Sequence, residues 1–327
     1  MPERSLLATL LVPGKVPSLA ASRLEENFRL IRIERADPAL VTEEMKQSVQ
    51  GMLGITVIDA AFIDVFPNLE IIANLGVGYD SIDAAHAGKK GVMVTNTPDV
   101  LTEEVADTTI GLLINTVREL PKAEKWLREG RWVREGSYPL TKATLRGRSV
   151  GIFGLGRIGR AIARRIEAFG LPVSYHNRRK IEDVSYSYYP TLVSLAEAVD
   201  TLISVAPGGA ATQKAVDATV LRALGPNGVF INIGRGTSVD EEALIAALRD
   251  GTILAAGLDV FADEPNVPQA LLDCENACLL PHVGSATVHT RQAMADLMVD
   301  NLISWFTKRQ ALTPVPETAN VKARTYS

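Results

Sequence analysis

Three residues with ionisable side chains each follow a short apolar stretch of the sequence. They are Arg235, Glu264 and His282, which follow the stretches 228–234, 255–261 and 277–281. An arginine can hold a carboxylate through two parallel hydrogen bonds, and a histidine exchanges a proton near neutral pH. A neighbouring carboxylate keeps such an imidazole charged and oriented. Together these residue types fit the reduction of a 2-keto acid, in which a cation holds the substrate and an acid protonates the developing alkoxide.

Each of these residues alone also has a purely structural explanation. An arginine on a glycine turn can bind a backbone carbonyl, and a lone histidine usually packs against its neighbours. Their shared location favours a catalytic role over a structural one. The carboxyl ends of parallel strands meet at one edge of a sheet, where ligands bind. Hydride transfer at that edge also requires a bound dinucleotide.

A glycine-rich turn between a predicted strand and a predicted helix supplies such a site. It stands between the apolar run 150–153 and a helical pattern that continues to Phe169. Its first glycine permits a tight turn, its second lets the backbone approach a pyrophosphate, and its third lets the helix pack close to the strand. The amides at the helix start then face the phosphates. The turn consists of Gly154, Leu155, Gly156, Arg157, Ile158 and Gly159.

The segment after the next predicted strand indicates which dinucleotide binds. In NAD-dependent proteins, an acidic residue about 20 positions past the glycines binds the adenosine ribose. Here Asn177, Arg178, Arg179 and Lys180 offer three cations and no acid. A ribose 2′-phosphate fits this group, and a basic surface turn is the alternative explanation. The sequence therefore favours NADPH over NADH, with reduction as the working direction.

The hydrophobic pattern predicts two doubly wound parallel-sheet domains that position these residues. In the first third, helices at 19–28 and 82–87 alternate with strands at 6–12, 30–33, 54–57, 71–75 and 92–95. A long helix at 102–118 and a loop at 121–142, rich in charged and aromatic residues, precede the glycine turn. Further strands are predicted at 150–153, 173–175, 201–205, 228–233, 253–260 and 277–280. An amphipathic helix at 294–306 follows, and only the last dozen residues look loosely structured.

Composition excludes several classes of protein. The 327 residues are 46% hydrophobic, and the net charge of −4 provides no basic surface for nucleic acid or anionic lipid. The apolar segment at 5–12 is preceded by Glu3 and ended by Pro13 and Gly14, as in a strand and unlike a signal peptide, and no stretch is long enough to span a membrane. Cys274 and Cys278, on a predicted surface loop, fit reduced thiols better than a disulfide framework or a zinc site. We expect a cytoplasmic protein without metal, nucleic-acid or membrane partners.

Several motifs together resemble the signatures of the D-isomer-specific 2-hydroxyacid dehydrogenases. Besides the glycine turn, they are the segments 96–107, 231–236, 257–265 and 280–285, and the resemblance runs from about Asn68 to Pro316. Within the family, the chain is most similar to the glyoxylate/hydroxypyruvate reductases and the plant-type hydroxyphenylpyruvate reductases. The resemblance implies NADPH-dependent reduction of glyoxylate or hydroxypyruvate to D-2-hydroxy acids.

The resemblance also implies a domain arrangement and a homodimer. Residues 1–98 and 288–327 would form a flavodoxin-like substrate domain, into which a Rossmann cofactor domain at 99–287 is inserted. The helix and loop at 102–142 would build the homodimer.

Individual residues acquire roles from the same resemblance. Arg235, Glu264 and His282 would be catalytic, and the substrate would contact Leu75, Gly76, Val77, Gly78, Arg235 and Ser285. Asp259 would hold the nicotinamide carboxamide. Beyond the glycine turn and residues 177–179, the cofactor would contact Val205, Ala206, Pro207, Thr212, Ile233, Gly234, His282 and Gly284. On spacing alone, the loop at 76–78 fits an anion site and a routine tight turn equally well.

Other activities remain open at this stage. An aromatic 2-keto acid is the first alternative substrate, because the size of the pocket depends on loops. Phosphoglycerate dehydrogenase is disfavoured because no regulatory domain follows the closing helix, and formate dehydrogenase because Glu264 is ionisable where no proton donor is needed. A dinucleotide-sensing co-repressor is the alternative from another class, although such proteins tend to carry a long disordered tail, absent here past Thr313.

Overall fold

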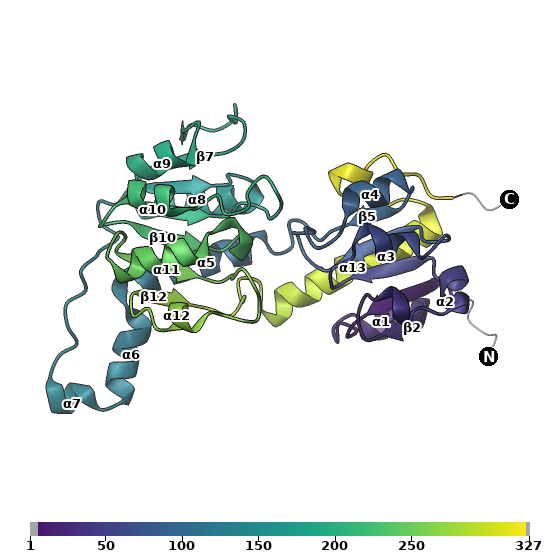
Figure 1. The fold of residues 1–327 in the computed structure, drawn as a ribbon, viewed down its shortest axis with the longest axis horizontal. Helices are drawn as coiled ribbons and strands as arrows, with labels where there is room; N and C mark the ends of the chain where they lie inside the picture. The colour runs from purple at the N-terminus through teal and green to yellow at the C-terminus, as the bar shows by residue number, and fades with distance from the viewer. Residues whose placement is uncertain (1–5, 325–327) are drawn as a thin grey trace. The chain divides into compact units, whose positions relative to one another are not determined.

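A computed structural model describes residues 6–324 of the chain (Figure 1). The chain divides into two compact units, one formed by Met1–Leu101 with Thr287–Ser327 and the other by Thr102–Ala286. Each unit contains one sheet of parallel strands with helices packed against it, which confirms the predicted α/β architecture.

The smaller unit has a five-stranded sheet in the order β2-β1-β3-β4-β5. This is the strand order of flavodoxin-like sheets, in which the topological switch point lies between the first and third strands. The strands are β1 (Thr9–Pro13), β2 (Arg29–Ile33), β3 (Gly51–Gly54), β4 (Ile71–Asn74) and β5 (Met93–Thr95).

Side chains of strand β1 alternate between two cores on opposite faces of this sheet. Leu10 packs in the core that contains Leu302 and Trp305, whereas Leu11 packs in the core that contains Phe62. The first core joins α1 (Ala21–Asn27) and the long α13 (Val288–Lys308), and the second joins α3 (Ala60–Asp64) and α4 (Ala84–Lys89). The short α2 (Glu43–Ser48) follows a hydrogen-bonded cap at Thr42. Helix α13, from the end of the chain, thus completes a core begun by β1.

The larger unit has a seven-stranded sheet in the order β12-β11-β10-β9-β6-β7-β8, the Rossmann order extended by one strand. Its strands are β6 (Val150–Phe153), β7 (Val173–His176), β8 (Ser187–Tyr188), β9 (Thr201–Ser204), β10 (Val229–Asn232), β11 (Ala255–Leu258) and β12 (Ala277–Leu279). Its helices include α5 (Thr102–Arg118), α8 (Arg157–Ala168), α9 (Leu192–Ala198), α10 (Ala218–Leu224), α11 (Glu241–Arg249) and α12 (Gln269–Leu272).

Helices cover both faces of the larger sheet. Ala256 and Leu258 of β11 share a core with residues of α9, α10 and α11. Gly257, between them, faces the opposite side and lies against Leu112 and Thr116 of α5. Only glycine fits there, because an added Cβ would lie 3.0 Å from Leu112 and closer still to Thr116.

The segment predicted as a loop at 121–142 contains two helices, α6 (Leu120–Arg128) and α7 (Arg131–Glu135). Residues 119–142, here called the arm, project from the sheet of the larger unit (Figure 1). The ring of Trp126 meets Tyr138 edge to face at 5.7 Å, and Arg131 lies 3.6 Å above the Trp126 ring. These local contacts order the arm without a core of its own, which explains why its mixed polar pattern does not predict helices.

Strand β3 was predicted three residues too late. The observed strand begins and ends with glycine, which weakens the local β signal. Both glycines lie in crowded surroundings: an added Cβ would lie 2.5 Å from a terminal methyl group of Leu10 at Gly51 and 2.7 Å from one of Ile82 at Gly54, so these side chains would have to move. Close packing therefore overrode strand propensity at this position.

Two further expectations are wrong. Cys274 is buried and Cys278 lies on β12, so neither is on a surface loop, although both are free thiols. Among the last dozen residues, the described ones are packed, because Thr318 is buried and Val321 and Ala323 pack against a core of the smaller unit. Within residues 6–324, no helix combines the length and hydrophobicity of a membrane span.

Candidate active site

The three predicted catalytic residues follow three neighbouring strands, β10, β11 and β12. His282 Nδ1 lies 2.6 Å from Glu264 Oε2, and Glu264 Oε1 accepts a hydrogen bond from the amide of Phe261 at 3.0 Å. The backbone therefore fixes the carboxylate, and the carboxylate orients the imidazole. The imidazole is about half exposed (48%), so a substrate can reach its second nitrogen, Nε2.

A buried carboxylate holds the loop that carries His282. Asp259, 1% exposed, accepts hydrogen bonds from the amides of Val283 at 2.7 Å and Gly284 at 2.8 Å. Burial raises the pKa of Asp259, while the two amides act in the opposite direction. His282 has a φ of 52°, in the left-handed region that residues other than glycine seldom occupy. The hydrogen bonds to Asp259 hold the backbone in this strained conformation.

The backbone around Arg235 is fixed by Asn232, the last residue of β10. Asn232 Oδ1 accepts a hydrogen bond from the amide of Gly234 at 3.1 Å, and its Nδ2 donates to the carbonyl of Arg235 at 3.0 Å. The next residue, Gly236, lies so close to the backbone of Phe261 that no Cβ would fit. The guanidinium donates to the carbonyl of Gly234 at 2.9 Å. These contacts fix the backbone position from which the side chain of Arg235 extends.

The three glycines of the turn between β6 and α8 have different surroundings. Gly154 has a φ of 102°, and an added Cβ would lie 2.9 Å from the nitrogen of Ala206. An added Cβ at Gly159 would overlap the carbonyl oxygen of Gly154, so α8 approaches β6 this closely only through glycine. Gly156 has no heavy atom within 4 Å of its Cβ position, which leaves open space over the start of the helix. This division matches what a dinucleotide turn requires.

The loops after β9 and β10 pack against the glycine turn. An added Cβ at Gly234 would lie 2.7 Å from the carbonyl oxygen of Ala206. Thr212 Oγ1 donates to the carbonyl of Pro207 at 2.6 Å and so closes the loop after β9. Ile233 lies within 3.4 Å of the Cβ position of Gly284, and the next residue, Ser285, is buried. The predicted cofactor residues Val205, Ala206, Pro207, Thr212, Ile233 and Gly234 therefore lie on two loops that adjoin each other, and the first of these loops adjoins Gly154 of the glycine turn.

The end of β7 contributes one structural residue and three exposed cations. Asn177 Oδ1 accepts a hydrogen bond from the amide of Leu155 at 2.7 Å and so ties this segment to the glycine turn. Arg178, Arg179 and Lys180 are exposed, and no carboxylate in the described chain pairs with them. Their charge is therefore available to an anion.

The loop at 75–78 belongs to the smaller unit and follows β4. The carbonyls of Gly76 and Gly78 each accept a hydrogen bond from Asn74 Nδ2 at 2.9 Å, and the carbonyl of Val77 accepts one from Asn96 at 2.8 Å. Among residues 6–324, no protein group accepts a hydrogen bond from the amides of residues 76–78. A cluster of such amides is a site for an anion, so the structure favours this interpretation over a routine turn.

Sequence reasoning missed the asparagines that shape these loops. Asn74 and Asn232 end their strands and are 5% and 1% exposed. A buried amide side chain needs hydrogen-bond partners, and the turn that follows the strand supplies them. An asparagine that ends an apolar run shortly before a glycine is the signal that would have found both. Within residues 6–324, no three His, Cys, Asp or Glu side chains gather to hold a metal ion.

The different surroundings of Gly159 and Gly156 lead to opposite predictions for two alanine variants. Gly159→Ala should lower the free energy of unfolding by about 3 kcal/mol, because the methyl group overlaps the backbone of Gly154. Gly156→Ala should lower it by less than about 1 kcal/mol, because the methyl group meets no protein atom. It should nevertheless weaken NADPH binding at least tenfold, or about 1.4 kcal/mol, by occupying the space of the pyrophosphate.

Urea unfolding and fluorescence titration with NADPH measure the two effects. Gly156→Ala serves as the control for Gly159→Ala in unfolding, since both changes add one methyl group to the same turn. Wild-type affinity of Gly156→Ala for NADPH would show that the dinucleotide does not cross this turn.

Comparison with known proteins gives consistent results. Residues 110–284 match the family model described as D-isomer specific 2-hydroxyacid dehydrogenase, NAD binding domain. The crystal structure of an NADPH-dependent glyoxylate/hydroxypyruvate reductase from Sinorhizobium meliloti, in complex with NADP and malonate, is 59% identical. It covers 98% of this chain and 99% of its own, with a TM-score of 0.94.

Two plant proteins extend the comparison. The glyoxylate/hydroxypyruvate reductase A of Arabidopsis thaliana is 47% identical over 91% of this chain and 96% of its own length. The hydroxyphenylpyruvate reductase of Plectranthus scutellarioides is 49% identical over 79% of this chain and 82% of its own. The chain therefore belongs to the D-isomer-specific 2-hydroxyacid dehydrogenase family.

Proposed function

We propose that this protein is an NADPH-dependent reductase that converts glyoxylate and hydroxypyruvate to the corresponding 2-hydroxy acids, in the D configuration where the product is chiral. The observation that carries the proposal is the 2.6 Å contact between Glu264 and His282, in the same unit as a turn with the glycine surroundings of a dinucleotide site. The names of the Sinorhizobium meliloti and Arabidopsis thaliana relatives support the same substrates. Free thiols at Cys274 and Cys278 fit the reducing cytoplasm that we propose as its location.

The cofactor would lie along the carboxyl edge of the larger sheet. The phosphates would contact the amides from Gly154 to Gly159, with Arg178 and Arg179 on the ribose phosphate and Asp259 near the carboxamide. The free space over Gly156 fits this arrangement. The reduced nicotinamide, when bound, supplies the hydride.

The protein groups would bind the substrate and move one proton. The amides of residues 76–78 are proposed to bind the substrate carboxylate, which the position of their carbonyl hydrogen bonds supports. Arg235 would bind substrate oxygens and polarise the ketone, and Ser285 and Leu75 would contact the substrate. His282 would donate the proton on Nε2 to the developing alkoxide while Glu264 stabilises the charged imidazole.

Parallel assays with glyoxylate, hydroxypyruvate and phenylpyruvate test this proposal through the loss of NADPH absorbance in the near ultraviolet. We expect the two small substrates to have the higher turnover per Michaelis constant. The hydroxyphenylpyruvate reductase relative makes an aromatic substrate the second candidate. Faster reduction of phenylpyruvate would favour it, and no reduction of any of the three would contradict the proposal.

Cofactor choice is tested by replacing Arg178 and Arg179 together with glutamine. Both side chains are exposed, so water screens them, and we expect a rise of about tenfold in the Michaelis constant for NADPH. The constant for NADH should barely change, because NADH lacks the 2′-phosphate. Arg222→Gln on α10 is the matched control, an exposed arginine bonded only to Thr219. Equal efficiency of the wild type with NADH and NADPH would contradict the assignment.

The contact between Glu264 and His282 predicts a loss of reduction activity in Glu264→Gln. The glutamine keeps a hydrogen-bond acceptor but removes the negative charge beside the imidazole. Reduction needs the charged imidazole as proton donor, whereas oxidation of the 2-hydroxy acid needs the neutral form. Turnover in reduction should therefore fall more than turnover in oxidation at the same pH.

Glu241→Gln provides the control for this experiment. Glu241 accepts a hydrogen bond from the amide of Ala262 at 2.8 Å, in the same loop, but makes no contact with His282. Its turnover in both directions should match that of the wild type. An equal loss in both directions in Glu264→Gln, or no loss, would show that the charge of Glu264 does not act on His282.

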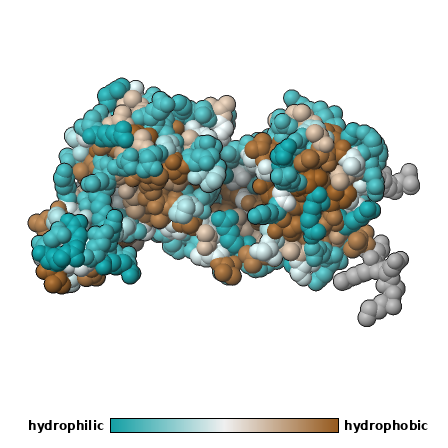
Figure 2. Space-filling view, turned by 60° about the horizontal axis from the view of Figure 1, so that its bottom comes forward, coloured by the Kyte–Doolittle hydropathy of each residue, from teal (hydrophilic) through white to brown (hydrophobic). Residues whose placement is uncertain are grey.

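We further propose a homodimer built by α5 and the arm. Figure 2 shows hydrophobic residues among hydrophilic ones on the arm, at the lower left of the view. The exposed apolar side chains there are Leu120, Leu127, Trp132, Val133 and Leu140, and Leu140 is 98% exposed. An apolar group of this kind favours a protein contact. Sedimentation velocity measures the assembly directly, and a monomer at micromolar concentration would contradict the proposal.

A further inference from the structure

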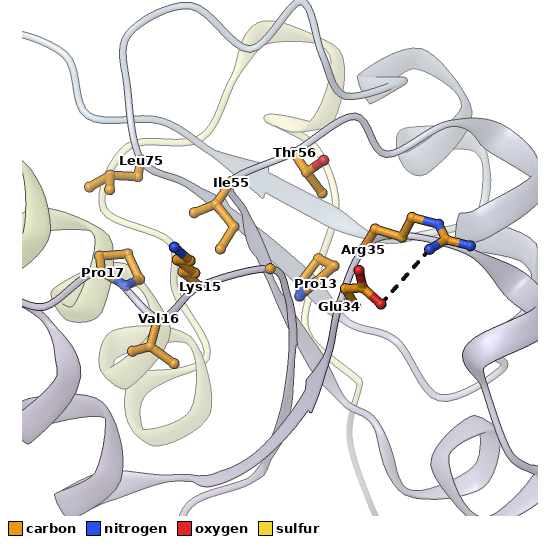
Figure 3. A pocket seen from close by; sticks show the side chains of 10 residues that line it. Pro13, Lys15, Val16, Pro17, Glu34, Arg35, Ile55, Thr56 and Leu75 are labelled. Carbon is orange, nitrogen blue, oxygen red and sulfur yellow. Dashed lines mark ion pairs between the residues drawn. The ribbon is translucent and has the colours of Figure 1, made fainter.

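The smaller unit contains a cavity of about 460 Å³ that the proposed mechanism does not use (Figure 3). It is lined by residues that follow β1 and β3, namely Pro13, Gly14 and Lys15 on one side and Ile55 and Thr56 on the other. These two strands are neighbours at the topological switch point of the sheet. In open parallel sheets, ligands bind in the crevice that opens at this point. The topology therefore marks the cavity as a binding site.

The cavity adjoins the loop at 75–78, whose amides are the proposed site for the substrate carboxylate. Leu75, which lines the cavity, is the residue directly before Gly76. Its side chain packs with those of Val16 and Ile55 on one core of the smaller unit, so the cavity has an apolar wall beside that loop. A 2-keto acid held by its carboxylate at residues 76–78 thus has room next to it for further atoms.

Lys15 gives the cavity a positive charge that no described carboxylate balances. Gly14, with a φ of 123°, turns the chain out of β1 and so presents Lys15 to the cavity. Figure 3 shows Lys15 between Pro17 and Ile55. Among residues 6–324, no ion pair or hydrogen bond involves its ammonium group. An anionic group of a ligand in the cavity could therefore pair with the ammonium group of Lys15.

The second cation of the cavity is already neutralised. Arg35 lies 2.7 Å from Asp37 and 3.9 Å from Glu34, the acidic residue that also lines the cavity. Figure 3 shows the Arg35–Glu34 pair on the other side of the cavity from Lys15. The charge available to a ligand is thus that of Lys15.

We propose that this cavity receives the end of the substrate remote from the ketone, and that Lys15 makes the enzyme favour 2-keto acids with a second anionic group. The inference rests on the proposed function, since it assumes a 2-keto acid bound at residues 76–78. Glyoxylate has no atoms beyond its aldehyde carbon and so carries no second anionic group. The second anionic group is a carboxylate or a phosphate, and both accept hydrogen bonds from an ammonium group.

Two matched pairs of substrates separate these chemistries. 2-Oxoglutarate and 2-oxopentanoate have the same number of carbons but differ in a terminal carboxylate. 3-Phosphonooxypyruvate and hydroxypyruvate differ in a phosphate. For each pair, the quantity measured is the ratio of turnover per Michaelis constant, anionic over uncharged, with NADPH.

In Lys15→Met, this ratio should fall about tenfold in at least one pair, and the pair with the larger fall identifies the anionic group. Lys15→Arg should keep most of the wild-type ratio, because the charge remains. Lys322→Met is the matched control, and both of its ratios should match the wild type, because Lys322 is exposed and does not line the cavity. Each ratio compares two substrates measured on the same variant. A general loss of activity or of folded protein therefore cancels.

The outcomes distinguish this inference from the proposed function. Unchanged ratios in Lys15→Met for both pairs, or a wild type that reduces neither anionic substrate, would overturn the role of Lys15. Reduction of glyoxylate would still stand in those cases. Failure of the wild type to reduce any 2-keto acid would overturn the proposed function itself.

Discussion

Both candidate sites depend on one constraint. The backbone amides and carbonyls in the turn after each buried strand need hydrogen-bond partners. Buried backbone groups must find partners, and one side chain beside each turn decides which groups remain. Asn74 donates to two carbonyls of the loop at 75–78 and leaves amides available. Asp259 does the reverse, because it takes the amides of Val283 and Gly284. The choice of amide or carboxylate thus sets the polarity of each loop.

The architecture follows from the hydrophobic pattern because that pattern reports burial. Strand β6 and helix α5 begin and end where the sequence predicts, since every residue of β6 is buried and α5 combines a buried stripe with acidic residues in its first turn. Strand β3 was misplaced because packing against Leu10 and Ile82 favours glycines that local propensity disfavours. The helices of the arm contain no buried residue, and ring and ion-pair contacts order them in place of core packing.

The candidate site was predictable in its residue types and only partly in its geometry. Arg235, Glu264 and His282 stand out because each follows a strand at the edge of the sheet where ligands bind. The sequence cannot reveal that one oxygen of Glu264 is held by the amide of Phe261, because that contact depends on the turn after β11. It also conceals the cavity beside Lys15, which forms only when β1 and β3, far apart in sequence, become neighbours.

At His282, the left-handed backbone creates a trade-off between thermal stability and activity. A glycine there would relieve strain of about 1–2 kcal/mol but would remove the imidazole. Screens that reward only survival at high temperature would therefore tend to discard this histidine. An engineer who wants a more heat-stable reductase should leave residues 282–284 untouched and seek gains outside the candidate site and the arm.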